Sequence, residues 1–185
     1  MGSAGLVEVA DPARAFLVEH DAPSPGSVIA PTLEGTRPLL VEVQALVAPG
    51  GYGPPRRTAS GIDPNRLALL IAVLGRRAGI ALGSHDVYAN LAGGLSVAEP
   101  GIDLPLAIAL ASSLRDAPVS PSMVAIGEVG LLGELRTVPG LDRRLREAAR
   151  LGFAEAIVPR AGRGGGLEVA GLEVVAANDL GDAIA

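Results

Sequence analysis

Residues 38–47, Pro-Leu-Leu-Val-Glu-Val-Gln-Ala-Leu-Val, carry the clearest strand pattern of the chain. The segment is apolar and partly β-branched, and its polar residues Glu42 and Gln44 alternate with apolar ones. Because successive side chains of a strand point to opposite faces of a sheet, this alternation predicts a strand with a buried face. Further strands are expected before it, at residues 27–30, and after it, at residues 86–91.

Helices are expected between the strands. Asp63 and Pro64 supply an N-cap and a first helical residue, and the apolar residues that follow recur on one face until Gly79. Two more helices are predicted, an apolar one at residues 104–114 and an amphipathic one at residues 141–151. Strands that alternate with helices predict an α/β fold, with a mixed sheet and packed helices.

The second half of the chain contributes short strands and turns. Strands are expected, in chain order, at residues 95–97, 123–129, 134–138, 154–158 and 173–176, with a loop at residues 162–166. Gly127, Gly130 and Gly133 form a glycine series, but their spacing does not fit a dinucleotide-binding loop. A hairpin turn at residues 130–133 is therefore the better interpretation.

The chain is expected to divide into an arm, residues 1–27, and one domain, residues 28–185. Asp11 and Pro12 can start a short helix in the arm, and residues 21–26, Asp-Ala-Pro-Ser-Pro-Gly, have the composition of a linker.

Composition excludes several kinds of site. The 185 residues include 15 Arg but no Lys, no Cys and only two His. A phosphate loop of the Walker type lacks its lysine, and neither a disulfide nor a cysteine-ligated zinc can form. His85 lies between Ser84 and Asp86, but neighbours on a strand point to opposite faces and cannot form a triad. The longest apolar run, residues 67–74, is far shorter than the roughly 20 residues that span a bilayer, and we expect a cytoplasmic protein without a bound metal.

The sequence resembles the C-terminal region of the RadA (Sms) family, bacterial RecA paralogues of DNA recombination and repair. The most specific stretch is residues 31–38, Pro-Thr-Leu-Glu-Gly-Thr-Arg-Pro, and the resemblance covers essentially the whole chain. Other stretches that carry it are residues 5–9, 25–29, 39–47, 56–57, 61–67, 86–94, 125–131 and 145–153. The resemblance implies that the arm is the end of an ATPase domain. It also implies that ATP and zinc belong to domains outside this chain, which is then a fragment without a cofactor of its own.

The C-terminal domain of that family is similar in turn to the protease domain of Lon. The resemblance places Gly101 at the position of the Lon serine and Asp142 at the position of the lysine. Arginine cannot replace that lysine, because a guanidinium stays protonated at any usable pH and a general base must lose its proton. We therefore expect a degenerate Lon-type domain, a pseudo-peptidase that is not an enzyme.

Basic residues are distributed unevenly although the net charge is −5. Residues 49–80 hold five Arg and a single acid, Asp63, and Tyr52 lies in their Gly/Pro-rich loop. A cationic loop with an aromatic side chain is suited to bind backbone phosphates and to stack on one base. The DNA-binding residues expected here are Tyr52, Arg56, Arg57, Arg66, Arg76 and Arg77. For Arg76 and Arg77, stabilisation of a helix C-terminus is the simpler alternative.

A second basic group lies on the helix expected at residues 141–151. It consists of Arg143, Arg144, Arg146 and Arg150. DNA, a neighbouring subunit and plain solvent remain open as what these side chains face. The functional hypothesis is a ring-forming domain, hexameric by resemblance, that binds single-stranded or branched DNA without base specificity and has RecA as a possible partner. The alternative is an oligomerisation scaffold that does not contact DNA.

Overall fold

A long antiparallel hairpin forms the centre of the molecule. In the computed structural model, which describes residues 23–160 and 168–185, β1 (Ser27–Glu34) pairs with β2 (Arg37–Pro49) from Ser27 opposite Gln44 to Glu34 opposite Arg37. Gly35 has a φ of +61°, which suits a two-residue turn between the strands. The strand predicted at residues 38–47 is confirmed, whereas β1 extends four residues beyond the segment expected for it.

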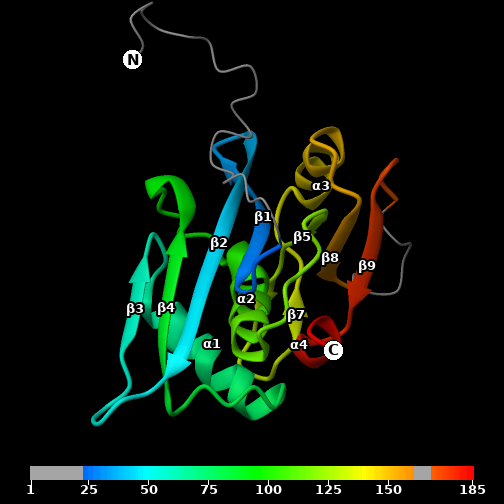
Figure 1. Ribbon diagram of the computed structural model, residues 1–185. Coiled ribbons are helices and arrows are strands. Elements are labelled where there is room, and N and C mark those ends of the chain that lie inside the picture. The colour runs from blue at the N-terminus through cyan, green and yellow to red at the C-terminus, as the bar shows by residue number, and fades with distance from the viewer. Residues whose placement is uncertain (1–22, 161–167) are drawn as a thin grey trace, which may run out of the picture.

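Seven strands form one mixed sheet in the order β3-β4-β2-β1-β5-β8-β9, and Figure 1 shows them side by side across the molecule. The β1–β2 and β2–β4 pairs are antiparallel and the others are parallel. The remaining bounds are β3 (Arg57–Ser60), β4 (His85–Leu91), β5 (Met123–Ala125), β8 (Glu155–Pro159) and β9 (Glu173–Ala177). The predicted α/β class with a mixed sheet is confirmed.

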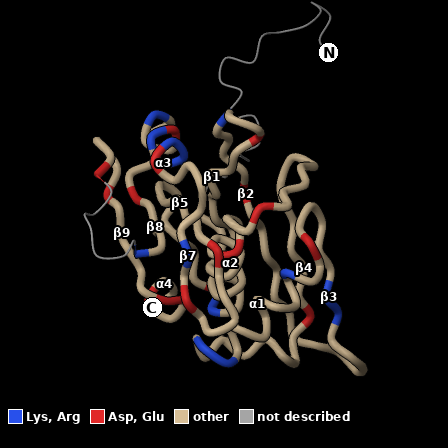
Figure 2. Tube along the Cα trace, turned by 180° about the vertical axis from the view of Figure 1, so that it is seen from behind, with Lys and Arg blue, Asp and Glu red and all other residues tan. Residues whose placement is uncertain are grey.

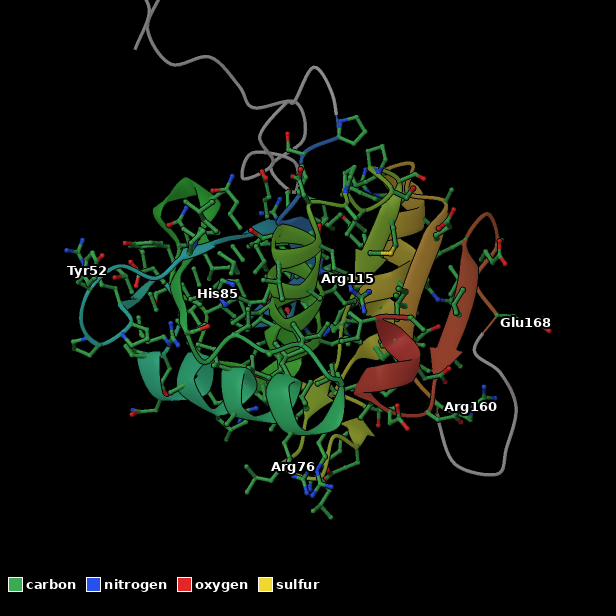
Figure 3. The ribbon with its side chains drawn as sticks, turned by 60° about the horizontal axis from the view of Figure 1, so that its bottom comes forward. Tyr52, Arg76, His85, Arg115, Arg160 and Glu168 are labelled. Atoms are coloured by element: carbon green, nitrogen blue, oxygen red, sulfur yellow. The ribbon has the colours of Figure 1, made fainter. Side chains whose placement is uncertain are left out.

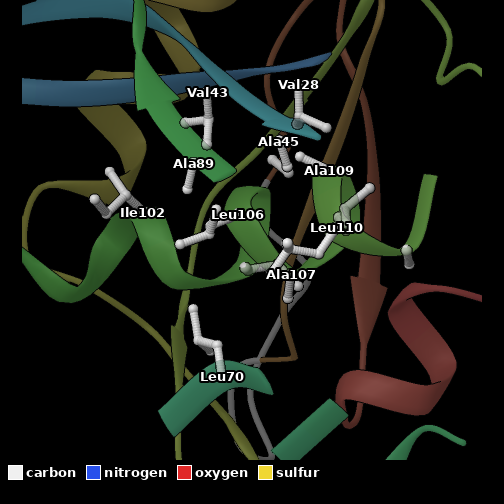
Figure 4. Close-up of a cluster of buried hydrophobic side chains, with 14 of the residues drawn as sticks. Val28, Val43, Ala45, Leu70, Ala89, Ile102, Leu106, Ala107, Ala109 and Leu110 are labelled. Atoms are coloured by element: carbon white, nitrogen blue, oxygen red, sulfur yellow. The ribbon is translucent and has the colours of Figure 1, made fainter. Parts of the chain in front are cut away.

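Helix α2 (Asp103–Arg115) fills the interior on one face of the sheet, and α1 (Pro64–Arg77) packs against it. Residues 103 to 112 are all buried, and their small and branched side chains meet Val28, Val43 and Ala45 of the central hairpin (Figure 4). The opposite face carries α3 (Leu141–Arg150), whose Leu145 packs in a second core with residues such as Leu40 and Val124. Strand alternation thus supplies one core from each face of the sheet.

Residues 123–129 do not form the single strand that their pattern predicts. The chain leaves the sheet after Ala125, and β6 (Glu128–Val129) pairs with β7 (Leu135–Arg136) in a separate two-stranded sheet. Gly127 allows this bend: a Cβ there would lie 2.6 Å from the Pro159 ring, and its backbone bonds to Gly101 and Leu104 instead of a strand. The hairpin turn predicted at residues 130–133 is confirmed by the bond from the Gly133 N–H to the Gly130 carbonyl, 3.0 Å.

Smaller features of the structure differ from the sequence-based expectations, and some expectations fall outside the described residues. The strand expected at residues 95–97 is absent; the chain forms 3-10 turns at η2 (Ala92–Gly94) and η3 (Pro100–Ile102). The short helix α4 (Leu180–Ala183) was not predicted, and Asp179 caps it by accepting from the Asp182 N–H at 2.9 Å. Most of the expected arm, residues 1–22, and the loop at residues 161–167 lie outside the described residues.

Candidate nucleic-acid interface

Arg57 serves the fold rather than a ligand. It opens β3, and its guanidinium donates to the carbonyls of His85, Leu82 (2.9 Å) and Gly83 (3.2 Å). These bonds fasten the first residue of an edge strand to the loop before β4. With the Arg56 carbonyl at 3.1 Å, the guanidinium donates to four carbonyls and has few donors left for a phosphate, so the structure argues against Arg57 as a DNA contact.

Arg56 and Tyr52 remain exposed, although Arg57 beside them is bound to the loop before β4. The backbone N–H of Arg56 donates to Asp86 at 2.7 Å, but its guanidinium has no hydrogen-bond or ion-pair partner within residues 23–160 and 168–185. Tyr52 is fully exposed and projects from the outer edge of the molecule in Figure 3. The loop that carries Tyr52 starts at a close approach, because a Cβ on Gly50 would lie 2.2 Å from the Ser84 carbonyl oxygen. Both residues are therefore available to a ligand, and their contact with DNA stays a prediction.

Arg76 and Arg77 end α1 and point to solvent. Both are exposed, and neither guanidinium has a partner in the part of the chain that the structure describes. In the last turn of α1, both arginines also interact favourably with the partial negative charge of the helix C-terminus. This is the alternative role that the sequence leaves open. This effect and a contact with phosphate are compatible, because the dipole leaves the guanidinium donors free.

Arg56, just before β3, and the exposed arginines at the end of α1 lie at the same end of the molecule. Residues 78–85, which connect α1 to β4, supply the carbonyls that hold Arg57, and Figure 2 shows blue segments at the start of β3 and the end of α1. Arg37 is another exposed arginine without a partner among the described residues, but it lies in the β1–β2 hairpin next to α3.

Arg66 is engaged with a buried acid. Its guanidinium forms a bidentate ion pair with Asp103, whose side chain is only 2% exposed and also accepts from the Val129 N–H at 3.2 Å. Burial raises the pKa of Asp103 above its ordinary value of 3.8, although the bonds from Arg66 and Val129 oppose the rise. Asp103 therefore holds α1 to the start of α2, and α2 begins without a side-chain cap bond.

The pocket beside this ion pair is a poor place for DNA. Its volume is about 300 Å³, and its walls include the carboxylates of Asp63, Glu99, Asp103 and Glu128 together with Arg66. Because carboxylates repel phosphate, this lining disfavours a contact between Arg66 and the DNA backbone. Sequence reasoning missed this because Asp103 and Glu128 lie far from Arg66 along the chain.

Arg144 is buried, and the expectation that it faces DNA, a neighbour or solvent is wrong. Its side chain is 2% exposed and bonds to both oxygens of Glu99, at 2.6 and 2.5 Å, and to the carbonyls of Pro31 and Pro139, each at 3.1 Å. Burial alone would raise the pKa of Glu99, but the bonds from Arg144 and Thr32 outweigh it and lower the pKa below its ordinary value of 4.5. Arg144 thereby ties α3 to β1 and to the segment before η3.

The other arginines of α3 are exposed but paired. Arg146 bonds to Asp142 at 2.9 Å, Arg150 to Glu147 at 2.8 Å, and Arg143 to the carbonyl of Thr36 at 2.9 Å. Pairs of this kind contribute little and open readily, so these residues remain weaker candidates than Arg56, Arg76 and Arg77.

The two positions that the Lon resemblance compares with a catalytic dyad do not form a polar pair. Gly101 is buried, and a Cβ on it would contact Ile126 and Val138 at 3.5 Å. Asp142 lies at the start of α3, about half exposed, in its ion pair with Arg146. Glu99 and Asp103, the nearest carboxylates in sequence, are each bound to a different arginine.

Comparison with known proteins identifies the family. Residues 70–162, about half of the chain, match the family model described as subunit ChlI of Mg-chelatase. The chain belongs to this family. It is also similar over its whole length to proteins named DNA repair protein RadA, with 47% identity over 184 residues to the one from Bacillus subtilis (strain 168) and 46% over 185 residues to the one from Synechocystis sp..

A third protein of that name, from Streptococcus pneumoniae, is 49% identical over 160 residues, or 86% of this chain. The chain covers 40%, 36% and 38% of the Bacillus, Synechocystis and Streptococcus proteins, and so spans about two fifths of the length of these relatives. The similarity to bacterial RadA proteins that residues 31–38 indicate is confirmed.

The family match corrects one expectation. We expected a chain that is not an enzyme, but it belongs to a family described by a subunit of Mg-chelatase, an enzyme, and matches RadA proteins along its full length. The error was to reason from Gly101 and Asp142, because the loss of one dyad excludes a single chemistry at a single place. No helix in the described residues is long and apolar enough to cross a bilayer, and these residues contain no group of three side chains that could ligate a metal ion.

Proposed function

We propose that this chain is the DNA-contacting part of a bacterial DNA repair protein, working in the cytoplasm, and that Arg56, Arg76 and Arg77 bind backbone phosphates without reading base sequence. The observation that carries the proposal is their placement: these three exposed guanidiniums lack partners within the described chain and share one end of the molecule. The name of the RadA relatives supports DNA as the partner. Tyr52, fully exposed in the loop before Arg56, supplies a ring on which an unpaired base can stack.

The net charge of −5 limits how DNA can approach. A chain with this charge repels DNA at long range, so attraction must come from the local arrangement of cations and is strongly weakened by salt. We therefore expect modest affinity for one copy and stronger binding when several copies act on one DNA molecule.

The test is a salt titration of binding to a labelled single strand and to a labelled duplex, followed by fluorescence anisotropy. Each lost phosphate contact lowers the slope of log K against log salt by about 0.7 for single strands and 0.9 for duplex. The variant R56A/R76A/R77A should therefore lower it by about 2 to 3. R37A is the matched control, because Arg37 is equally exposed and unpartnered among the described residues but lies at the other end, and its slope should not change.

The same slope in wild type and in a folded R56A/R76A/R77A variant would show that DNA does not bind at this end. Circular dichroism checks the fold of each variant. Arg57 is left unchanged in this experiment because its removal alters the fold itself.

We also propose that copies of the chain assemble into a ring. The sheet ends at two edge strands, β3 and β9, and apolar side chains lie exposed at Val175 on β9 (47%) and Leu46 on β2 (60%). Exposed edges and apolar side chains are common at subunit contacts. Sedimentation velocity between 1 and 200 µM, on the order of the range in which weak complexes form, tests this: a single monomer boundary at all concentrations would reject assembly of this chain on its own.

A further inference from the structure

The turn between β6 and β7 presents two leucines to solvent. Leu131 is 68% and Leu132 72% exposed, and they occupy the central positions of a turn closed by Gly130 and Gly133. Gly133 has a φ of +85°, a conformation that glycine adopts without strain. Polar residues and glycine are usual at such positions, so two adjacent exposed leucines are unexpected in a turn that serves only as a connection.

Several bonds hold this turn in place. The Gly133 carbonyl accepts from the N–H of the buried Leu180 at 2.8 Å, and the Leu132 N–H donates to the Glu134 carboxylate at 3.0 Å. Glu134 is held in turn by Arg136 at 2.6 Å. The two leucines therefore project from a turn whose backbone is fixed by hydrogen bonds, and they could become buried only if these bonds broke.

Unpartnered cations flank the leucines. A Cβ placed on Gly133 would lie 3.0 Å from the Cβ of Arg77, so the turn touches the end of α1, and Figure 3 shows Arg76 projecting from this end of the molecule. Of the nearby acids, Glu134 is paired with Arg136, whereas Asp182 and Asp179 accept hydrogen bonds from neutral donors and keep their negative charge.

The pairing of exposed leucines with arginines indicates nucleic acid rather than protein as the binding partner. Two leucine side chains are far less than the roughly 800 Å² that each partner buries in a stable protein complex. Apolar wedges next to arginines are, however, how proteins separate stacked bases while they hold the adjoining phosphates. A mixed apolar and cationic tip matches the flat apolar face of a base and the phosphate beside it.

We propose that Leu131 and Leu132 insert against unpaired bases where a DNA duplex opens, while Arg76 and Arg77 hold the flanking phosphates. This inference rests on the proposed function, because it needs DNA at the end of the molecule that carries Arg56, Arg76 and Arg77. It adds a class of DNA, a junction between paired and unpaired strands, and a pair of residues that recognises it.

The experiment compares a forked duplex with a fully paired duplex of equal length, each carrying 2-aminopurine next to the position where the fork opens. Wild-type chain should prefer the fork by about tenfold and raise 2-aminopurine fluorescence, since loss of stacking on one base is worth a factor of this order. L131S/L132S should lose both effects and keep the salt slope of wild type, because no phosphate contact is removed. L131M/L132M should retain the preference, because methionine keeps an apolar side chain of similar volume at both positions.

The outcomes separate the two proposals. If wild type binds no DNA, the proposed function fails and this inference fails with it. If wild type binds and L131S/L132S keeps the fork preference and the fluorescence rise, only the role of the leucines is rejected. If L131S/L132S instead lowers the sedimenting mass and leaves DNA binding unchanged, the turn contacts a second copy of the chain and the inference is overturned. Leu131 and Leu132, the positions changed in these variants, are both exposed, and unfolding midpoints confirm that each variant folds.

Discussion

Removal of Arg144 should destabilise the fold without affecting a DNA contact. The change R144A deletes a guanidinium that is 2% exposed and leaves Glu99 without its bidentate partner, although the carboxylate keeps its bond to Thr32. R146A is the matched control, because Arg146 lies on the same helix, is 70% exposed and pairs with Asp142 four residues away.

The magnitudes follow from burial. Breaking a buried ion pair by removing one partner costs about 3 to 5 kcal/mol. Because the Glu99 side chain is 24% exposed and water can reach it, we expect a loss near the lower end, about 3 kcal/mol. The exposed pair of the control is worth about 0.3 to 0.5 kcal/mol. Arginine and alanine are both good helix formers, so propensity changes little and by the same amount in both variants.

Urea unfolding followed by far-ultraviolet circular dichroism measures the difference. With a slope of about 2 kcal/mol per molar urea, R144A should unfold at a midpoint about 1.5 M lower than wild type, and R146A within about 0.3 M of it. The double variant R144M/E99Q should be less destabilised than the sum of its single changes by at least about 1 kcal/mol, since it removes both charges. Equal midpoints for R144A and R146A would refute the buried ion pair. A lower salt slope of DNA binding in R144A would show that Arg144 contacts DNA.

Three further predictions concern other contacts. R57A should lower the free energy of unfolding by about 1 to 2 kcal/mol, because it leaves the carbonyls of Leu82, Gly83 and His85 without their bonds to β3. It should leave the salt slope of DNA binding unchanged, and a changed slope without lost stability would show that Arg57 contacts DNA. D63A should cost about 1 kcal/mol in urea unfolding through loss of the N-cap bond to Asn65, and no measurable loss would show that α1 does not depend on this cap. The pKa of Glu99 is lowered in the folded chain, so its ionised carboxylate stabilises the fold fully above the ordinary pKa of 4.5, and this stabilisation disappears as the pH falls through the folded value. The difference in unfolding free energy between wild type and E99Q should therefore be constant at neutral pH and shrink below about pH 4.5. A difference that grows on acidification would contradict the lowered pKa.

The sequence predicts those parts of the fold that depend on local pattern. The alternation around Glu42 and Gln44 gives β2, and Asp63 with Pro64 gives the start of α1, because a strand face and a helix cap are set by neighbouring residues. Strand β3 was missed since residues 57–60 are few and mostly polar, and their pairing with β4 depends on the carbonyls that hold Arg57.

The exposure of a candidate residue could be predicted only where that residue has no distant partner. Arg56 and Arg76 are exposed as expected, whereas Arg66 and Arg144 are bound to Asp103 and Glu99, acids 37 and 45 positions away in the chain. Local sequence contains no signal for such pairs. The exposed Leu131 and Leu132 did have one, because two leucines between turn glycines are unusual, and a search for apolar residues at turn centres would have found them.

The place of β1 in the sheet has a consequence for how the chain folds. On one side β1 pairs with its immediate neighbour β2, while on the other it meets β5 through Ile29 and Val124, which are 95 positions apart. The antiparallel hairpin can form early, because little chain entropy is lost in closing a two-residue turn. Addition of β5, β8 and β9 must wait until α1 and α2 have been placed, and long-range closure of this kind slows folding. Until then the β5-facing edge of β1 stays open and able to pair with another chain, so refolding at high concentration should favour aggregation over the native sheet.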